Sequence, residues 1–107
     1  MIEVIYYREH NRVTVTGHAN AAPIGEDLVC SAASILARTL AANVEHLVKS
    51  GAARDSVIRL EEGDAEISCK VSHKFKAVAE TIFSGICVGF EILADGAPDF
   101  ISYSVRG

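Results

Sequence analysis

Hydrophobic and polar residues alternate with a period of two in five short stretches of the chain. Because successive side chains on a strand point to opposite faces, this alternation predicts β-strands. Glu9-His10-Asn11 joins the first two stretches and Gly63-Asp64 joins the next two, and both connections have turn chemistry. The sequence therefore predicts two hairpins and a separate last strand. The five predicted strands are residues 2–8, 12–17, 56–62, 65–72 and 100–105.

Two longer stretches repeat their hydrophobic residues every three or four positions, which predicts amphipathic helices. The first helix is expected to start at Asp27, a suitable N-cap residue, and to end near Gly51. The second is expected over residues 74–94, where Gly85 and Gly89 allow close packing. The hydrophobic side of the first helix is expected to contain Leu28, Val29, Ala32, Ala33, Ile35, Leu36, Leu40, Val44 and Leu47, and that of the second Phe75, Val78, Ala79, Ile82, Phe83, Ile86, Phe90 and Leu93.

These elements follow one another in the order ββαββαβ. Strand pairs alternating with amphipathic helices predict an α+β two-layer sandwich, in which two helices pack on one face of a mostly antiparallel sheet. The order of the strands within the sheet does not follow from the sequence. A length of 107 residues predicts one domain, residues 1–107, with a single hydrophobic core.

Charge and hydropathy narrow the class of partner. Fourteen acidic and ten basic residues give a net charge of -4, which argues against direct nucleic-acid binding and favours a basic protein or peptide partner. The first residues lack the pattern of a signal peptide, and no unbroken apolar run approaches the roughly 20 residues that cross a bilayer. We therefore expect a cytoplasmic protein without a membrane partner.

Three irregularly spaced cysteines predict reduced thiols rather than a disulfide framework. No cysteine or histidine pair has the spacing of zinc ligands, so neither a metal nor a cofactor is expected. Cys69 is predicted to face the core from its strand, and Cys87 to be a small buried residue of the second helix. Cys30 falls at the border between the polar and apolar sides of the first helix, where a reagent can reach it.

Candidate chemistry concentrates in residues 17–34. The dipole and free amides in the first turn of a helix favour the thiolate form of Cys30. His18 precedes it by a short loop that can fold back, so its imidazole is a candidate general base. Because the first backbone N–H groups of a helix have no partner within it, those of Val29, Cys30 and Ser31 are candidate donors to an oxyanion.

Three further features have open roles. Asp27 either caps the helix or orients His18, and a carboxylate at this position also opposes thiolate formation. Ser34 lies one turn after Cys30 and either faces the site or belongs to the polar side of the helix. The loop of residues 19–26 is expected to close over an extended peptide, and its candidate substrate-binding residues are Ala19, Asn20, Pro23 and Gly25.

The chain resembles the ribosomal-processing cysteine protease family, Prp, over essentially its whole length. Its matching residues are Gly17-His18-Ala19, Gly25, Asp27, Val29, Cys30 and Ser34. The resemblance implies a cytoplasmic, homodimeric cysteine endopeptidase that removes a short N-terminal extension from a large-subunit ribosomal protein and cuts after an aromatic residue. The chain departs from the family pattern at Asn20, where glycine is common, and at Ser31, where alanine is frequent. These departures concern peptide subsites rather than the His18 and Cys30 pair.

Two other functions fit the same residues. A non-enzymatic, ribosome-associated dimeric module would use the loop only for binding. A redox sensor would oxidise Cys30 reversibly, although Cys69 and Cys87, if buried, are poor resolving partners. Fast modification of Cys30 by iodoacetamide at pH 6, relative to free cysteine, would favour the protease over the binding module.

Overall fold

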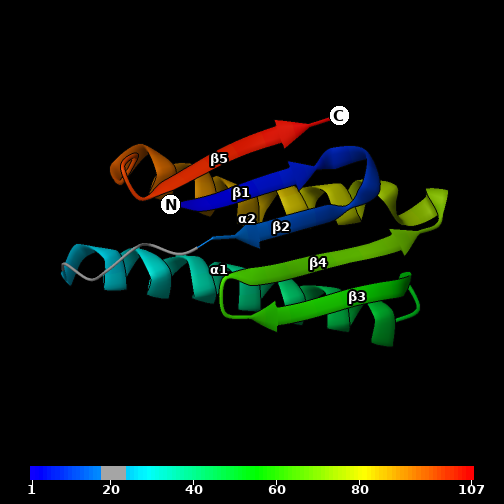
Figure 1. The fold of residues 1–107 in the computed structure, drawn as a ribbon. Helices are drawn as coiled ribbons and strands as arrows, with labels where there is room; N and C mark the ends of the chain where they lie inside the picture. Colours follow the sequence, from blue (N-terminus) through cyan, green and yellow to red (C-terminus); the bar gives the residue numbers. More distant parts are fainter. Residues whose placement is uncertain (18–23) are drawn as a thin grey trace.

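The computed structural model describes residues 1–17 and 24–107, and of residues 24–27 only the backbone. All predicted strands and helices are present in the predicted order (Figure 1). They are β1 (Ile2–Tyr7), the 3-10 turn η1 (Arg8–His10), β2 (Arg12–Thr16), α1 (Ile24–Lys49), β3 (Ala53–Glu61), β4 (Asp64–Val71), the 3-10 turn η2 (His73–Phe75), α2 (Lys76–Gly96) and β5 (Ile101–Arg106).

The strands form one sheet in the order β3-β4-β2-β1-β5, and both helices lie behind it in Figure 1. The pairs β1 with β2, β2 with β4, and β3 with β4 are antiparallel. β5 is parallel to β1, because α2 carries the chain back along the sheet before β5 begins. The predicted α+β sandwich with a mostly antiparallel sheet is confirmed.

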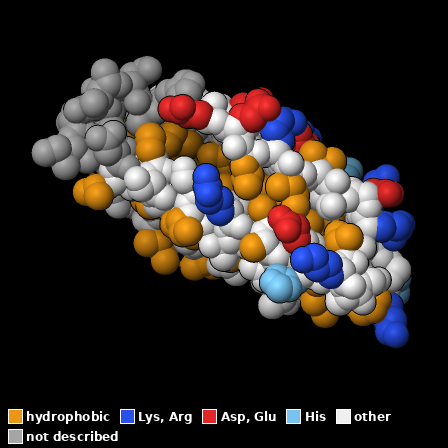
Figure 2. All heavy atoms as spheres, turned by 90° about the horizontal axis from the view of Figure 1, so that it is seen from below, with side chains coloured by type: hydrophobic (Ala, Val, Ile, Leu, Met, Phe, Trp, Pro, Cys, Tyr) orange, Lys and Arg blue, Asp and Glu red, His pale blue; other side chains and the backbone are white. Residues whose placement is uncertain are grey.

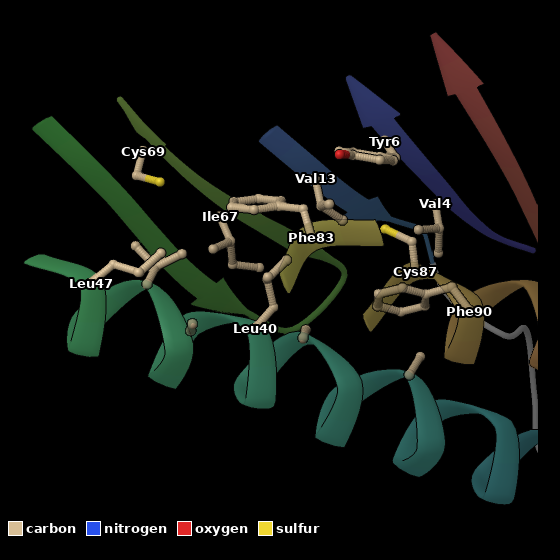
Figure 3. Close-up of a cluster of buried hydrophobic side chains, with 14 of the residues drawn as sticks. Val4, Tyr6, Val13, Leu40, Leu47, Ile67, Cys69, Phe83, Cys87 and Phe90 are labelled. Atoms are coloured by element: carbon tan, nitrogen blue, oxygen red, sulfur yellow. The ribbon is translucent and has the colours of Figure 1, made fainter. Parts of the chain in front are cut away.

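The core lies between the sheet and the two helices (Figure 3). Alternate residues of neighbouring strands, such as Val13 and its partner Ile67, point toward the helices and are fully buried. α1 contributes Leu40 to this layer, and α2 contributes Phe83, whose ring stacks on Tyr6 with centroids 6.1 Å apart. Burying each such side chain contributes about 1.5–3 kcal/mol, so the two-layer arrangement follows from the strand and helix periods.

The helix periods were correct, but some of the residues expected on the covered side are exposed. Leu28 and Ile35 of α1 are 68% and 61% exposed, and Val78 of α2 is 47% exposed. α1 instead turns its buried residues, among them Ala33 and Ala37, toward the rest of the core. The period of the sequence shows that each helix has a hydrophobic stripe. The angle at which the helix crosses the sheet decides how much of that stripe the sheet covers.

Gly85 and Gly89 of α2, both expected to allow close packing, behave differently. A side chain at Gly89 would come within 2.6 Å of Leu36 on α1, so this glycine permits the close approach of the helices. Gly85 has nothing within 4 Å of the corresponding position, and the predicted packing role is wrong for this residue.

Both helices are long and apolar enough, by length and composition, to cross a membrane. The segments are Leu28–Lys49 and His73–Gly96, which reach this threshold by mean hydropathy. The expectation concerned apolar runs, which this average does not test. Polar residues interrupt both segments, and each helix buries one side, with Leu40 and Phe83 at less than 2% exposure. This is the pattern of helices that cover a sheet in a folded domain.

We expect the protein to lose stability above pH 9 because it buries thiol and phenol groups in their neutral form. Burial raises the pKa of Cys87 from 9.0 to about 11. The unfolded chain therefore releases this proton first, so the stabilisation is complete below pH 9 and disappears as pH rises through 11. At pH 10.5 the free energy of unfolding should fall by about 2 kcal/mol on account of Cys87 alone.

Urea denaturation at pH 8 and pH 10.5 measures this effect. Cys87→Ala should show a pH-dependent loss that is smaller than that of the wild type by about 2 kcal/mol. An equal loss in both proteins would show that Cys87 does not carry the effect.

Candidate active site

Cys30 is the accessible thiol among the three cysteines, all of which lie in the described part of the chain. Its side chain is half-buried and packs against the edge of the core, as predicted for a border position. Cys69 and Cys87 are each 2% exposed, which confirms the prediction that they are buried. Burial raises the pKa of both, so at neutral pH they are protonated and out of reach. Thiol chemistry with a bulky substrate is therefore confined to Cys30.

A cleft of about 330 Å³ lies beside Cys30, between α1, the end of β2 and the β3–β4 turn. The first residue of β1 also borders it. The alanines of α1 have small side chains, so the cleft has room for a side chain of a bound molecule. Its lining residues are Ile2, Val15, Gly17, Cys30, Ala33, Ser34, Ala37, Arg38, Leu60, Glu61, Glu62, Gly63 and Ala65.

Gly17 brings the chain to this cleft directly after β2. Its N–H donates a hydrogen bond to the Gly63 carbonyl oxygen at 3.0 Å, which ties it to the β3–β4 turn. Its φ of +95° lies in the region that favours glycine, and a Cβ atom there would overlap the Met1 carbonyl oxygen. Only glycine fits this position without displacing backbone. His18 follows Gly17 directly in the sequence.

Several predicted site residues lie outside the described residues. These are His18 and the loop residues Ala19, Asn20 and Pro23. Of the side chain of Asp27 nothing is described, so its predicted effect on His18 stays a prediction. Gly25, predicted as part of the substrate loop, belongs instead to the first turn of α1.

The start of α1 corrects two further predictions. The helix begins at Ile24, so Asp27 lies within its first turn and is not the N-cap residue. The sequence pattern was interpreted as a loop because of Pro23, but proline is well tolerated where a helix starts. Cys30 consequently lies in the second turn, beyond the first turn to which the dipole effect is largely confined.

The earlier start of α1 also changes the position of the predicted oxyanion donors within the helix. In an α-helix each N–H from the fifth residue on donates to the carbonyl four residues earlier. The N–H groups of Val29, Cys30 and Ser31 therefore point to carbonyls within α1, and they are not free to bind an oxyanion. Unpaired N–H groups belong to the first turn of a helix, and in α1 that turn starts at Ile24.

The structure also brings into the cleft residues that local sequence patterns did not indicate. Ser34 lines it, as one of the two predicted alternatives required, and so does Arg38 one turn later. Leu60 and Glu61 reach it from the end of β3, and Glu62 reaches it from the β3–β4 turn. The pairing of β4 with β2 places this turn beside α1, and no local period in the sequence encodes that contact. In the ranges 1–17 and 24–107, no group of three or more His, Cys, Asp or Glu residues is placed to hold a metal ion.

Comparisons with known proteins give a family for this chain and solved structures that are similar to it. The family model described as cysteine protease Prp matches residues 1–102. No curated protein matches the sequence. The crystal structure of SMU.848 from Streptococcus mutans is similar to the chain at a TM-score of 0.69 and 22% identity, over 98% of this chain and 91% of that one.

Two crystal structures of the essential ribosomal processing protease Prp from S. aureus are similar as well. The complex with a substrate peptide has a TM-score of 0.70 and 16% identity, and covers 98% of this chain and 97% of that one. The complex with a covalently linked product peptide has a TM-score of 0.69 and 17% identity, with the same coverage. At these identities the structures support the fold alone.

Proposed function

The chain belongs to the cysteine protease Prp family and is a cysteine peptidase. From this premise we propose that it removes an N-terminal extension from a large-subunit ribosomal protein. In this proposal Cys30 is the nucleophile and His18 is the general base. The observation that carries the assignment of Cys30 is its place in the cleft. It is the least buried of the three thiols, and Gly17, the neighbour of His18 in sequence, lines the same cleft.

In the proposed reaction the His18 imidazole takes the proton of the Cys30 thiol. The thiolate sulfur attacks the scissile carbonyl carbon and forms a C–S bond, and the tetrahedral intermediate collapses with cleavage of the C–N bond. The imidazolium protonates the leaving amine. A water molecule, deprotonated by His18, then hydrolyses the thioester, which releases the carboxylate product and restores the thiol.

The S. aureus protease was crystallised with a substrate peptide and with a covalently linked product peptide, and this supports a peptide ligand and a covalent intermediate. For this chain we propose that the peptide lies in the cleft, with an aromatic residue before the scissile bond. Ala19, Asn20 and Pro23 are proposed to contact it, and Asp27 to orient the His18 imidazole.

We further propose a cytoplasmic homodimer. The outer side of the helix layer exposes large hydrophobic residues, of which the most exposed are Leu28 and Ile35 on α1 and Val88 and Ile92 on α2, at 54–68%. Exposed large hydrophobic residues, where they form a patch, are typical of contacts between proteins. Sedimentation equilibrium should give twice the mass of 11.4 kDa, and a monomer at micromolar concentration would contradict the proposal.

Incubation with the extended ribosomal protein of the same organism tests the function. Mass spectrometry should show the ribosomal protein shortened at one site, directly after an aromatic residue. A protein that binds the extension and leaves it intact would instead be the non-enzymatic module. Cleavage at many unrelated sites would show a general peptidase without the proposed substrate.

A further inference from the structure

Arg38 is a basic residue that lines the cleft from α1. The same helix carries Cys30 and Ser34, and the three side chains line the cleft together. Two small residues of this helix, Ala33 and Ala37, line it as well. In the view from below, hydrophobic side chains lie on both sides of a basic one (Figure 2). The cleft therefore extends along α1 from the thiol of Cys30 to a guanidinium group.

The guanidinium group of Arg38 is available to a ligand. The residue is exposed. The ion pairs within the ranges 1–17 and 24–107 involve Arg12 and Arg59, and they leave Arg38 without a partner. A guanidinium group has five N–H donors and no acceptor, and it binds a carboxylate through two parallel hydrogen bonds. An acidic side chain of a bound peptide is therefore a suitable partner for Arg38.

The opposite side of the cleft carries a different set of side chains. Leu60 pairs with the buried residue Ala65, so its side chain faces the helices and lines the cleft. Because successive residues of a strand point to opposite faces, the side chain of Glu61 lies on the outer face of the sheet. Glu62 lines the cleft from the β3–β4 turn. A peptide side chain that faces α1 therefore meets Arg38, and one that faces the hairpin meets Leu60 or Glu62.

Helix geometry gives the separation between Arg38 and the reacting bond. Arg38 follows Cys30 by about two turns of α1, which corresponds to about 12 Å along the helix axis. An extended peptide advances by about 3.3 Å per residue. A peptide that is bonded to Cys30 and follows the cleft along α1 therefore reaches Arg38 after about three or four residues.

We infer that Arg38 gives the protease a preference for peptides with an acidic residue about three or four positions from the scissile bond, on the side of that bond where the peptide follows α1. The inference rests on the proposed function, because it concerns the substrate of that same site. A glutamate at this position accepts charge-assisted hydrogen bonds from Arg38, whereas a lysine meets a like charge. Because the side chains of an extended peptide alternate, the preference belongs to the residue that faces α1 and not to its neighbours.

Internally quenched peptides with one fixed phenylalanine, and with glutamate, glutamine or lysine at each other position in turn, test the inference. At one position about three or four residues from the cleaved bond, kcat/KM should be about five- to tenfold higher for glutamate than for lysine. In Arg38→Gln this ratio should fall to about one, and in Arg38→Glu the preference should reverse in favour of lysine. Both peptides are cleaved by the same preparation, so the ratio does not depend on how much of a variant is folded.

The matched control is Lys49→Glu, which makes the same change of charge at an exposed residue of α1 that does not line the cleft. It should keep the glutamate preference of the wild type. Loss of the preference in Lys49→Glu as well would show that net charge, and not Arg38, causes it.

The remaining outcomes separate the inference from the function beneath it. Equal rates for glutamate and lysine peptides at every position in the wild type would overturn the inference and leave the peptidase activity standing. A glutamate preference that survives in Arg38→Glu would overturn the assignment to Arg38. No cleavage of any peptide or of the extended ribosomal protein would refute the proposed function, and the inference with it.

Discussion

Cys30→Ala is expected to reduce peptide cleavage by about 10³-fold or more, to the level of the background. Alanine removes the sulfur that forms the thioester and leaves a side chain that α1 accommodates readily. Because the cleft is otherwise unchanged, the variant should still bind the uncleaved peptide. Stopped assays with a quenched peptide measure the rate, and fluorescence anisotropy with the same sequence measures binding.

The matched control is Cys69→Ala, since Cys69 is buried in β4 and does not line the cleft. It should retain the cleavage rate of the wild type at temperatures where both are folded. His18→Ala should lose about 10²–10⁴-fold, as expected when a general base is removed. Wild-type cleavage by Cys30→Ala would show that the nucleophile lies elsewhere.

Gly17→Ala should lower both stability and activity. The new Cβ atom would overlap the Met1 carbonyl oxygen, and alanine is strained at a φ of +95°. Strain and backbone displacement together should reduce the free energy of unfolding by about 2–4 kcal/mol. The cleavage rate of the folded variant should also fall, because the displaced backbone leads directly into His18. Urea denaturation and kcat/KM at a low temperature measure the two effects.

Gly51→Ala separates strain from overlap. Gly51 has a φ of +82°, and nothing lies within 4 Å of the position of a Cβ atom. Its replacement should therefore cost only about 1 kcal/mol of strain and leave the cleavage rate unchanged. If Gly17→Ala were no more harmful than Gly51→Ala, the close contact with Met1 would not fix the path of the chain.

The secondary structure was predictable because each element carries its own period. The alternation in β4 placed Cys69 in the core, and the structure agrees. The start of α1 was predicted about one turn late, because Pro23 and Gly25 have loop propensities that a helix start also tolerates. The exposure of Leu28 and Ile35 was not predicted. The period of the sequence identifies the hydrophobic side of the helix, but it does not show how much of that side the rest of the core covers.

The site was only partly predictable. Cys30 could be singled out, because its border position is a local property of one helix. The side of the cleft formed by Leu60 and Glu62 could not, because it depends on the place of β4 beside β2 and on the fold of a distant turn.

Trapping the nucleophile tests the central claim most directly. The protein is treated with a chloromethyl ketone built on a peptide with a terminal phenylalanine, digested, and mapped by mass spectrometry. We predict one adduct per chain, on Cys30, with parallel loss of peptide cleavage. An adduct confined to another residue, or full modification of Cys30 without loss of cleavage, would contradict the account.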